Sequence, residues 1–416
     1  MNRQSDKYVP NIHLYAEHLQ NIRTLSIQAS LSTVSNQATK ATLSADGHYL
    51  TVEHEGEKVA IRLPVSLGSH GDATLTIPAA PTKDLTFRLN VGQKPETHDA
   101  LSNSVHKPEN IIPWMAGELT PETAVSCATC HAEIVRSGQI RQWKDLPSEG
   151  WAEMMDFWHC HKPDEPHDHA HEAENVSRGF AANSRLTVRP GMGLVGPMDF
   201  LFAAEDCSEL EVRPCDSRKV SPICSPFSSR NAGSKEPAFP GREVTITKAI
   251  GVLDPSTEGF KLRKPCLSIA VSQKTSSRGY SHEKWLSSAL LTAAESQGVM
   301  RLALHASDWS SGHPISMMHT WLFAPDLVIS SSAADTKAAI RVVKVLYREG
   351  VSADIETLGK MGSAEDELEF SKEEWCEMRS LLDRSAELLP GKARRFQQWN
   401  VGLLRRFVED DVSDMP

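Results

Sequence analysis

The stretch Cys127-Ala128-Thr129-Cys130 places two thiols close together, with two residues between them. Further along the chain, Trp158-His159-Cys160-His161 offers a third thiol between two imidazoles. Thiolate and imidazole are preferred zinc ligands, and two short-spaced groups brought together by the intervening fold can complete a tetrahedral site. Because protein groups would fill all four positions, such a metal holds the fold rather than activating water. We therefore expect structural zinc (Zn2+) bound by Cys127, Cys130, Cys160 and His161, with His159 as the substitute for His161.

Three other interpretations of the cysteine pair stay open at this point. The thiols could be buried without a metal. The segment Cys127-Ala128-Thr129-Cys130-His131 also matches the attachment pattern of c-type haem, with His131 as axial ligand, although such attachment ordinarily requires export. Finally, His131-Ala132-Glu133 resembles half of a zinc-deaminase motif, but Pro214-Cys215 is not followed by the second cysteine of that motif.

Histidines recur just after this region, within or beside the acidic segment Pro163 to Glu174. They could form a weak second metal site. Flexible Asp, Glu and Pro residues separate them, however, so they lack preorganisation and a solvated loop is favoured. The charge of such a loop would change between about pH 5 and 7. The histidines are His159, His161, His167, His169 and His171.

The composition is that of a folded soluble protein. Hydrophobic residues make up 40% and charged residues 24% of the 416 residues, whereas a disordered chain would be poorer in apolar side chains. The net charge of -10 disfavours direct binding to nucleic-acid phosphates. The first residues resemble neither a signal nor a transit peptide, and no apolar stretch approaches the roughly 20 residues that span a bilayer. We expect a cytoplasmic and nuclear protein with reduced thiols and no membrane association.

The sequence predicts an α+β protein whose N-terminal part is rich in β-strands. Apolar and polar residues alternate over 25–31, and the same pattern recurs at 50–52, 59–63 and 85–89. A Glu-Gly pair at 55–56 predicts a turn between the second and third of these strands. A sheet with meander-type connections accounts for this pattern without helices.

Four regions follow from the changes in composition. We expect a β-rich N-terminal domain at 1–110 and a zinc-binding region with the histidine-rich loop at 111–212. A low-complexity linker or insertion rich in Pro, Ser and Gly covers 213–242. An α+β C-terminal domain covers 243–416. Within the first two regions, the polar segment Gln93 to Asn110 reads as a linker, and Ser148 could cap a short helix.

The C-terminal region mixes helical and strand patterns and is expected to end in two helices. A helix is predicted at 281–297, strands at 300–305 and 320–329, and a strand or short helix at 340–347. Ser371 and Glu374 form a capping-box pattern at the start of a helix that we expect to reach Leu389. Helical spacing then recurs among Phe396, Trp399, Leu403 and Phe407, which predicts the second helix.

The remaining cysteines carry no clear chemical signal. A catalytic thiol needs exposure and a lowered pKa, and sequence reports neither. Nucleotide-binding loops, nucleophile elbows and dinucleotide fingerprints are also missing from the chain. A structural or incidental role is the simplest interpretation of Cys207, Cys215, Cys224, Cys266 and Cys376.

Several motifs together resemble the HECT-like ubiquitin ligases, a family also named for binding a ubiquitin-conjugating enzyme. The first motifs are the cysteine pair, Leu146-Pro147-Ser148-x-x-Trp151 and Trp158-His159-Cys160-His161. The last is Leu389-Pro390 followed by Arg395-Phe396-x-x-Trp399-x-Val401-Gly402-Leu403-Leu404-x-Arg406. The resemblance extends from about Asn11 to Phe407. The chain departs from the family pattern before Ala249, where members often carry a further cysteine pair and this chain has none.

The resemblance implies a ubiquitin-protein ligase that accepts ubiquitin from a conjugating enzyme and passes it to substrate proteins, with cyclins among the proposed substrates. A HECT-type ligase carries ubiquitin as a thioester on its own cysteine, and Cys376 occupies the late position that such a nucleophile would have. Its place beside Trp375 in a predicted helix suits packing better, so the catalytic residue stays unknown. The alternative is a non-catalytic, zinc-stabilised adaptor or assembly factor for mRNA 3′-end processing, since a yeast relative in the family is a polyadenylation factor.

Overall fold

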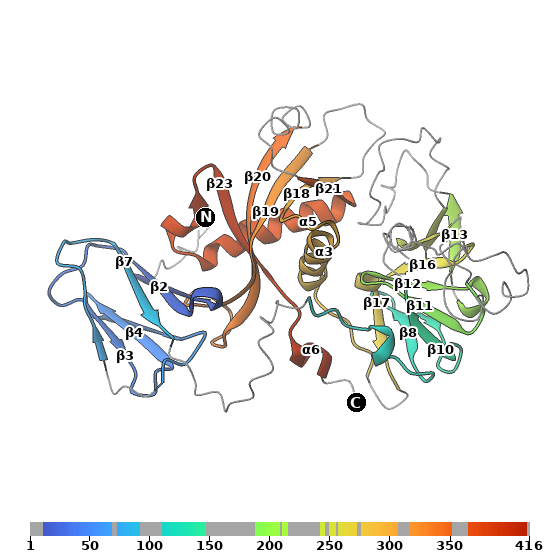
Figure 1. The fold of residues 1–416 in the computed structure, drawn as a ribbon, viewed down its shortest axis with the longest axis horizontal. Helices are drawn as coiled ribbons and strands as arrows, with labels where there is room; N and C mark the ends of the chain where they lie inside the picture. Colours follow the sequence, from blue (N-terminus) through green and yellow to red (C-terminus); the bar gives the residue numbers. More distant parts are fainter. Residues whose placement is uncertain are drawn as a thin grey trace, which may run out of the picture.

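The fold is rich in β-strands and has few helices, which agrees with an α+β protein (Figure 1). The α+β prediction is therefore confirmed. A computed structural model gives the structure. It describes residues 11–68, 73–91, 110–146, 188–208, 210–214, 242–245, 249–254, 257–272, 276–306, 316–351 and 365–413. Within these residues no helix is long and apolar enough to cross a membrane.

The largest sheet combines strands from both ends of the chain. Its order is β22-β23-β20-β19-β1-β2-β7, and β18 pairs with both β19 and β21. β1 is antiparallel to β19, with Tyr15 opposite Ser331. One sheet therefore contains strands from both sides of the boundary predicted at residue 110. The strands are β1 (Ile12–Leu19), β2 (Thr24–Leu31), β7 (Asp84–Asn90), β18 (Arg301–Ala306), β19 (Ser316–Ser331), β20 (Ile340–Val351), β21 (Asp366–Phe370), β22 (Arg395–Phe396) and β23 (Trp399–Arg405).

A small antiparallel sheet packs against the N-terminal strands of the large sheet, with which it shares a buried cluster. In the turn between β4 and β5, Glu55 and Gly56 have φ angles of 50° and 81°. Positive φ at both central residues is the geometry of a tight hairpin turn, so the predicted Glu-Gly turn is confirmed. The four strands predicted in this half of the chain all exist. This sheet contains β3 (Lys40–Leu43), β4 (Tyr49–His54), β5 (Glu57–Arg62) and β6 (Ala73–Leu75).

Two further sheets form the middle of the chain. The seven-stranded sheet has the order β10-β11-β12-β16-β15-β14-β13, and the three-stranded sheet has the order β17-β8-β9. The strands of the former are β10 (Gln142–Asp145), β11 (Met192–Val195), β12 (Asp199–Phe202), β13 (Glu211–Pro214), β14 (Arg242–Thr245), β15 (Ala249–Leu253) and β16 (Phe260–Arg263). The latter contains β8 (Ala124–Cys127), β9 (Glu133–Val135) and β17 (Leu267–Ala270).

Helices α3 (His282–Gln297) and α5 (Lys372–Ser385) pack on the large sheet, and α3 stands on the side that faces the seven-stranded sheet (Figure 1). One hydrophobic core joins these layers, because Phe200, Trp285 and Leu304 belong to the same buried cluster. The predicted helices at 281–297 and from Ser371 are confirmed. Gly402 in β23 allows close packing of α5, since a Cβ atom there would lie 2.7 Å from Cδ2 of Leu382.

The second predicted helix, over Phe396 to Phe407, is wrong because this segment forms β22 and β23. Val401, Leu403 and Leu404 are all at most 5% exposed, so the strand is buried on both faces. A strand covered on both sides is apolar at nearly every position, and such a run also fits helical spacing. The chain does end in two helices, which are α5 and the short α6 (Glu409–Ser413).

Several predicted segments lie wholly or mostly outside the described residues. They are the linker at 93–110, the helix beginning at Ser148, the histidine-rich loop at 163–174 and the insertion at 213–242. These segments and the division into four regions stay predictions.

Candidate functional site

Cys127 and Cys130 lie at the tight connection between β8 and β9. The N–H of His131 donates to the carbonyl of Cys127 at 3.0 Å, and the N–H of Cys127 donates to the carbonyl of Ala132 at 2.9 Å. His131 has a φ of 60°, which closes the turn. The Cys127 side chain is buried and Cys130 is exposed. This turn presents one thiol to the interior and one to the surface.

The other predicted zinc ligands cannot be placed, because Cys160, His161 and the substitute His159 lie outside the described residues. Among the described residues, no group of three or more His, Cys, Asp or Glu side chains could hold a metal. The fold therefore provides a pair of ligands at the β8–β9 turn, and two ligands alone do not make a structural zinc site. Zinc binding stays a prediction.

The fold brings Cys266 to this turn, which the sequence did not indicate. β17 pairs with β8, with Leu267 opposite Cys127, and the N–H of Ala128 donates to the carbonyl of Cys266 at 2.9 Å. This proximity depends on the pairing of two distant strands. The sequence around Cys266, a cysteine that follows a proline, gives no sign that it lies beside the β8–β9 turn.

Lys264, two residues before Cys266, is a completely buried cation. Its Nζ donates to the carbonyl of Pro113 at 3.2 Å and lies 5.1 Å from the ring centre of Phe200. Burial lowers the pKa of Lys264 to about 7, although Asp199 and Glu118 oppose the shift. This lysine is therefore close to losing its charge at neutral pH.

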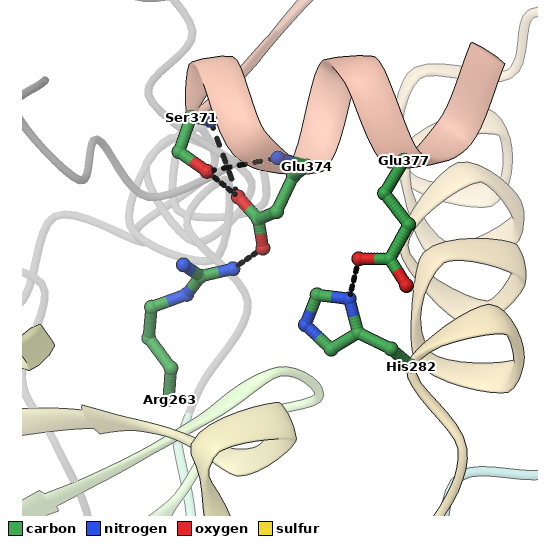
Figure 2. A network of polar contacts seen from close by, with 5 residues as sticks. All are labelled: Arg263, His282, Ser371, Glu374 and Glu377. Carbon is green, nitrogen blue, oxygen red and sulfur yellow. Dashed lines mark hydrogen bonds and ion pairs between the residues drawn. The ribbon is translucent and has the colours of Figure 1, made fainter. Parts of the chain in front are cut away.

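Arg263 connects the seven-stranded sheet to helix α5 (Figure 2). Its guanidinium pairs with the carboxylate of Glu374. The other oxygen of Glu374 accepts from the Ser371 hydroxyl at 2.9 Å, and the Ser371 Oγ accepts from the Glu374 N–H at 3.2 Å. Burial lowers the pKa of Arg263, while Cys266 and Asp199 act in the opposite direction. One carboxylate thus caps a helix and neutralises a partly buried cation.

A second contact ties α5 to α3. Nδ1 of His282, the first residue of α3, lies 2.6 Å from Oε2 of Glu377 (Figure 2). Both side chains are partly exposed. Together with the Arg263–Glu374 pair, this contact ties α5 to both α3 and the seven-stranded sheet.

Cys376 lies on the exposed side of α5. Its neighbour Trp375 points inward and donates from Nε1 to the carbonyl of Leu304 at 3.3 Å. Trp375 thus packs in the core, and Cys376 is exposed. By contrast, burial raises the pKa of the Cys207 thiol to about 12. Cys215 and Cys224 lie outside the described residues.

The closing motif has a structural explanation. Val401 to Leu404 form the buried centre of β23, and Gly402 leaves room for Leu382 of α5 to pack against the strand. Arg406 is 3% exposed, pairs with Asp326 at 3.0 Å and donates to the carbonyl of Pro325 at 2.7 Å. These motif residues hold the large sheet together.

A model of the family described as HECT-like ubiquitin-conjugating enzyme (E2)-binding matches residues 17–401. The chain belongs to this family. The resemblance noted in the sequence is thereby confirmed, and membership links the chain to the ubiquitin pathway.

Relatives within fungi are distant. An uncharacterized protein of Saccharomyces cerevisiae is 23% identical over 295 residues, which cover 69% of this chain and 71% of the relative. An uncharacterized protein of Schizosaccharomyces pombe is 25% identical over 311 residues, which cover 71% of this chain and 78% of the relative. No solved structure matches the chain.

Proposed function

We propose that this protein is a ubiquitin-protein ligase that binds a ubiquitin-conjugating enzyme and passes ubiquitin to substrate proteins. The observation that carries the proposal is the family match over residues 17–401, which includes most of the large sheet and all of α5. The family description names binding of a conjugating enzyme. Transfer of ubiquitin to a substrate is the step that we add. Cyclins are candidate substrates.

Cys376 is our candidate for the thiol that would carry ubiquitin. Its thiolate would attack the carbonyl carbon of the thioester on the conjugating enzyme. A new thioester forms as the old one breaks, and the thiol of the conjugating enzyme leaves. Exposure on α5 supports this role, because the incoming thioester must reach the sulfur.

The test incubates the full chain with ubiquitin-charged conjugating enzymes and compares reducing with non-reducing gels. A ligase with Cys376 as nucleophile gives a ubiquitin adduct that reductant removes. Cys376→Ala should abolish the adduct, and Cys376→Ser should convert it to an ester that resists reductant. Cys207→Ala is the matched control and should leave the adduct unchanged. If every charged enzyme binds and none transfers ubiquitin, the ligase proposal is wrong and binding alone survives.

A structural zinc ion is part of the same proposal. The β8–β9 turn that holds Cys127 and Cys130 supports it, with Cys160 and His161 as the other expected ligands. In such sites the free energy of metal binding contributes to folding. Cys127→Ser and Cys160→Ser should each lower the zinc content of purified protein, measured by elemental analysis, and lower the melting temperature. Wild-type protein without zinc would contradict the proposal.

The second candidate function is a non-catalytic adaptor, such as an assembly factor for mRNA 3′-end processing. Two of the described thiols favour it, because Cys127 is buried and the raised pKa of Cys207 leaves little thiolate at neutral pH, whereas Cys376 is exposed. An adaptor should tolerate alanine at every cysteine outside the zinc ligands. If such variants still bind their partners and support cell growth, the protein is an adaptor and not a thioester-forming ligase.

A further inference from the structure

Four aromatic side chains form a continuous stripe on the large sheet, and none of them was singled out by the sequence as a binding residue. The ring centres of Trp321 and Phe323 are 5.3 Å apart, and those of Phe323 and Phe396 are 6.2 Å apart. Phe396 pairs across strands with Trp399. We call these four residues the aromatic stripe.

An arginine lies over the tryptophan at each end of the aromatic stripe. The guanidinium carbon of Arg301 is 4.9 Å from the ring centre of Trp321, and that of Arg348 is 5.1 Å from the ring centre of Trp399. Leu302, next to Arg301, faces the core that contains α3 and α5. Since strand neighbours point to opposite faces, Arg301 and Trp321 lie on the face that these helices leave uncovered.

The aromatic stripe coincides with a concentration of exposed apolar surface. Phe323 and Phe396 are 49% and 46% exposed, and Met300, directly before Arg301, is 45% exposed. The carbonyl of Met300 accepts a hydrogen bond from the N–H of Leu322, which places Met300 beside the stripe. In the described part of the chain, three of the six large hydrophobic residues that are exposed lie here. Clustered exposed apolar residues mark interaction surfaces.

The two arginines lack ion-pair partners within the described residues, although the chain has a net charge of -10. Other cations nearby are paired: Lys344 with Glu17 and Arg379 with Glu349. Moreover, Nε of Arg348 is buried and has no hydrogen-bond acceptor among the described residues. A buried donor without an acceptor is unfavourable, and a carboxylate supplied by a partner would remove this cost.

We propose that the aromatic stripe and its two arginines bind an acidic segment of a partner protein. An apolar side chain of the segment packs on Phe323 and Phe396, and flanking carboxylates pair with Arg301 and Arg348. Trp, Met and Arg are enriched at the centres of protein interfaces. Aromatic rings with arginines also bind single-stranded nucleic acid, but the chain's net charge opposes that ligand. This inference does not depend on ubiquitin transfer.

The test pans a phage-displayed library of random peptides against the full wild-type chain. Recovered peptides are counter-selected against the double variant Arg301→Gln/Arg348→Gln and against Phe323→Ser/Phe396→Ser. Arg62→Gln and Ile22→Ser, at exposed sites elsewhere, are the matched controls. Circular dichroism and melting temperature establish that each variant is folded. An oligo-uridine probe tests for nucleic-acid binding.

Peptides that require the aromatic stripe should carry Asp or Glu on both sides of an apolar residue. Their affinity should fall at least about tenfold in either double variant, fall as salt increases, and stay unchanged in the controls. The proposal is overturned if no peptide depends on the stripe, or if the dependent peptides lack acidic residues. It is also overturned if oligo-uridine binds at the stripe more tightly than the peptides do.

Discussion

At the scale of single residues, Lys264 makes the protein's stability depend on pH. Its pKa is lowered to about 7 in the folded state, whereas an unfolded lysine titrates near 10.4. Between these values the unfolded chain binds more protons, so the free energy of unfolding contributed by Lys264 rises with pH, by at most about 1.4 kcal/mol per pH unit. Below pH 7 both states are charged, and burial of the charge is fully destabilising.

Lys264→Met should remove this rise. Urea unfolding measured from pH 6.5 to 9.5 should show that wild type gains stability relative to the variant as pH increases. Lys40→Met, at an exposed lysine, serves as the control and should follow the wild-type curve. A constant difference between wild type and Lys264→Met would show that Lys264 has an ordinary pKa.

Residue-level chemistry was only partly visible in the sequence. The cysteine pair at a turn follows from local spacing, and Cys127 and Cys130 do lie at one. Cys266 beside that turn and Arg301 over Trp321 depend on strand register instead. Each contact joins residues on different strands, so local sequence patterns could not indicate either one.

At the scale of elements, α5 depends on Glu374, which pairs with Arg263 and completes the capping box with Ser371. Glu374→Gln keeps the side-chain volume but leaves the partly buried guanidinium of Arg263 without the carboxylate that pairs with it. Loss of one partner from such a pair costs about 3 kcal/mol. Glu373→Gln, at the exposed neighbouring position, should cost well below 1 kcal/mol. Chemical denaturation of both variants measures the difference, and equal effects would contradict a role for the pair.

The contrast between α5 and β23 explains which elements could be predicted. The start of α5 is encoded locally, because a capping box and one apolar face belong to the same short segment. In β23 apolar residues are buried on both faces of the strand, so their spacing also fits a helix. Gly402 is the local sign of a strand covered closely by another element, since its missing side chain makes room for Leu382.

At the scale of the whole molecule, β1, β2 and β7 belong to a sheet whose other strands come from the C-terminal half. A chain beginning at residue 110 would lose β1, β2 and β7 and expose the edge of β19. An unpaired edge of this length promotes aggregation. Size-exclusion chromatography should therefore find this truncated protein aggregated, whereas a chain beginning at residue 11 should elute as wild type does. A monomeric, cooperatively unfolding 110–416 fragment would show that the C-terminal region folds alone.

The closure of the large sheet also sets a condition on biosynthesis. The N–H of Leu14 bonds to the hydroxyl of Ser332, 318 residues further along. At about 5 to 20 residues per second, a ribosome needs roughly 15 to 60 s to make the intervening chain. During that time the first strands have no partner from β19. The edge of β1 that pairs with β19 therefore stays open to unwanted association in the nascent chain until β19 has been made.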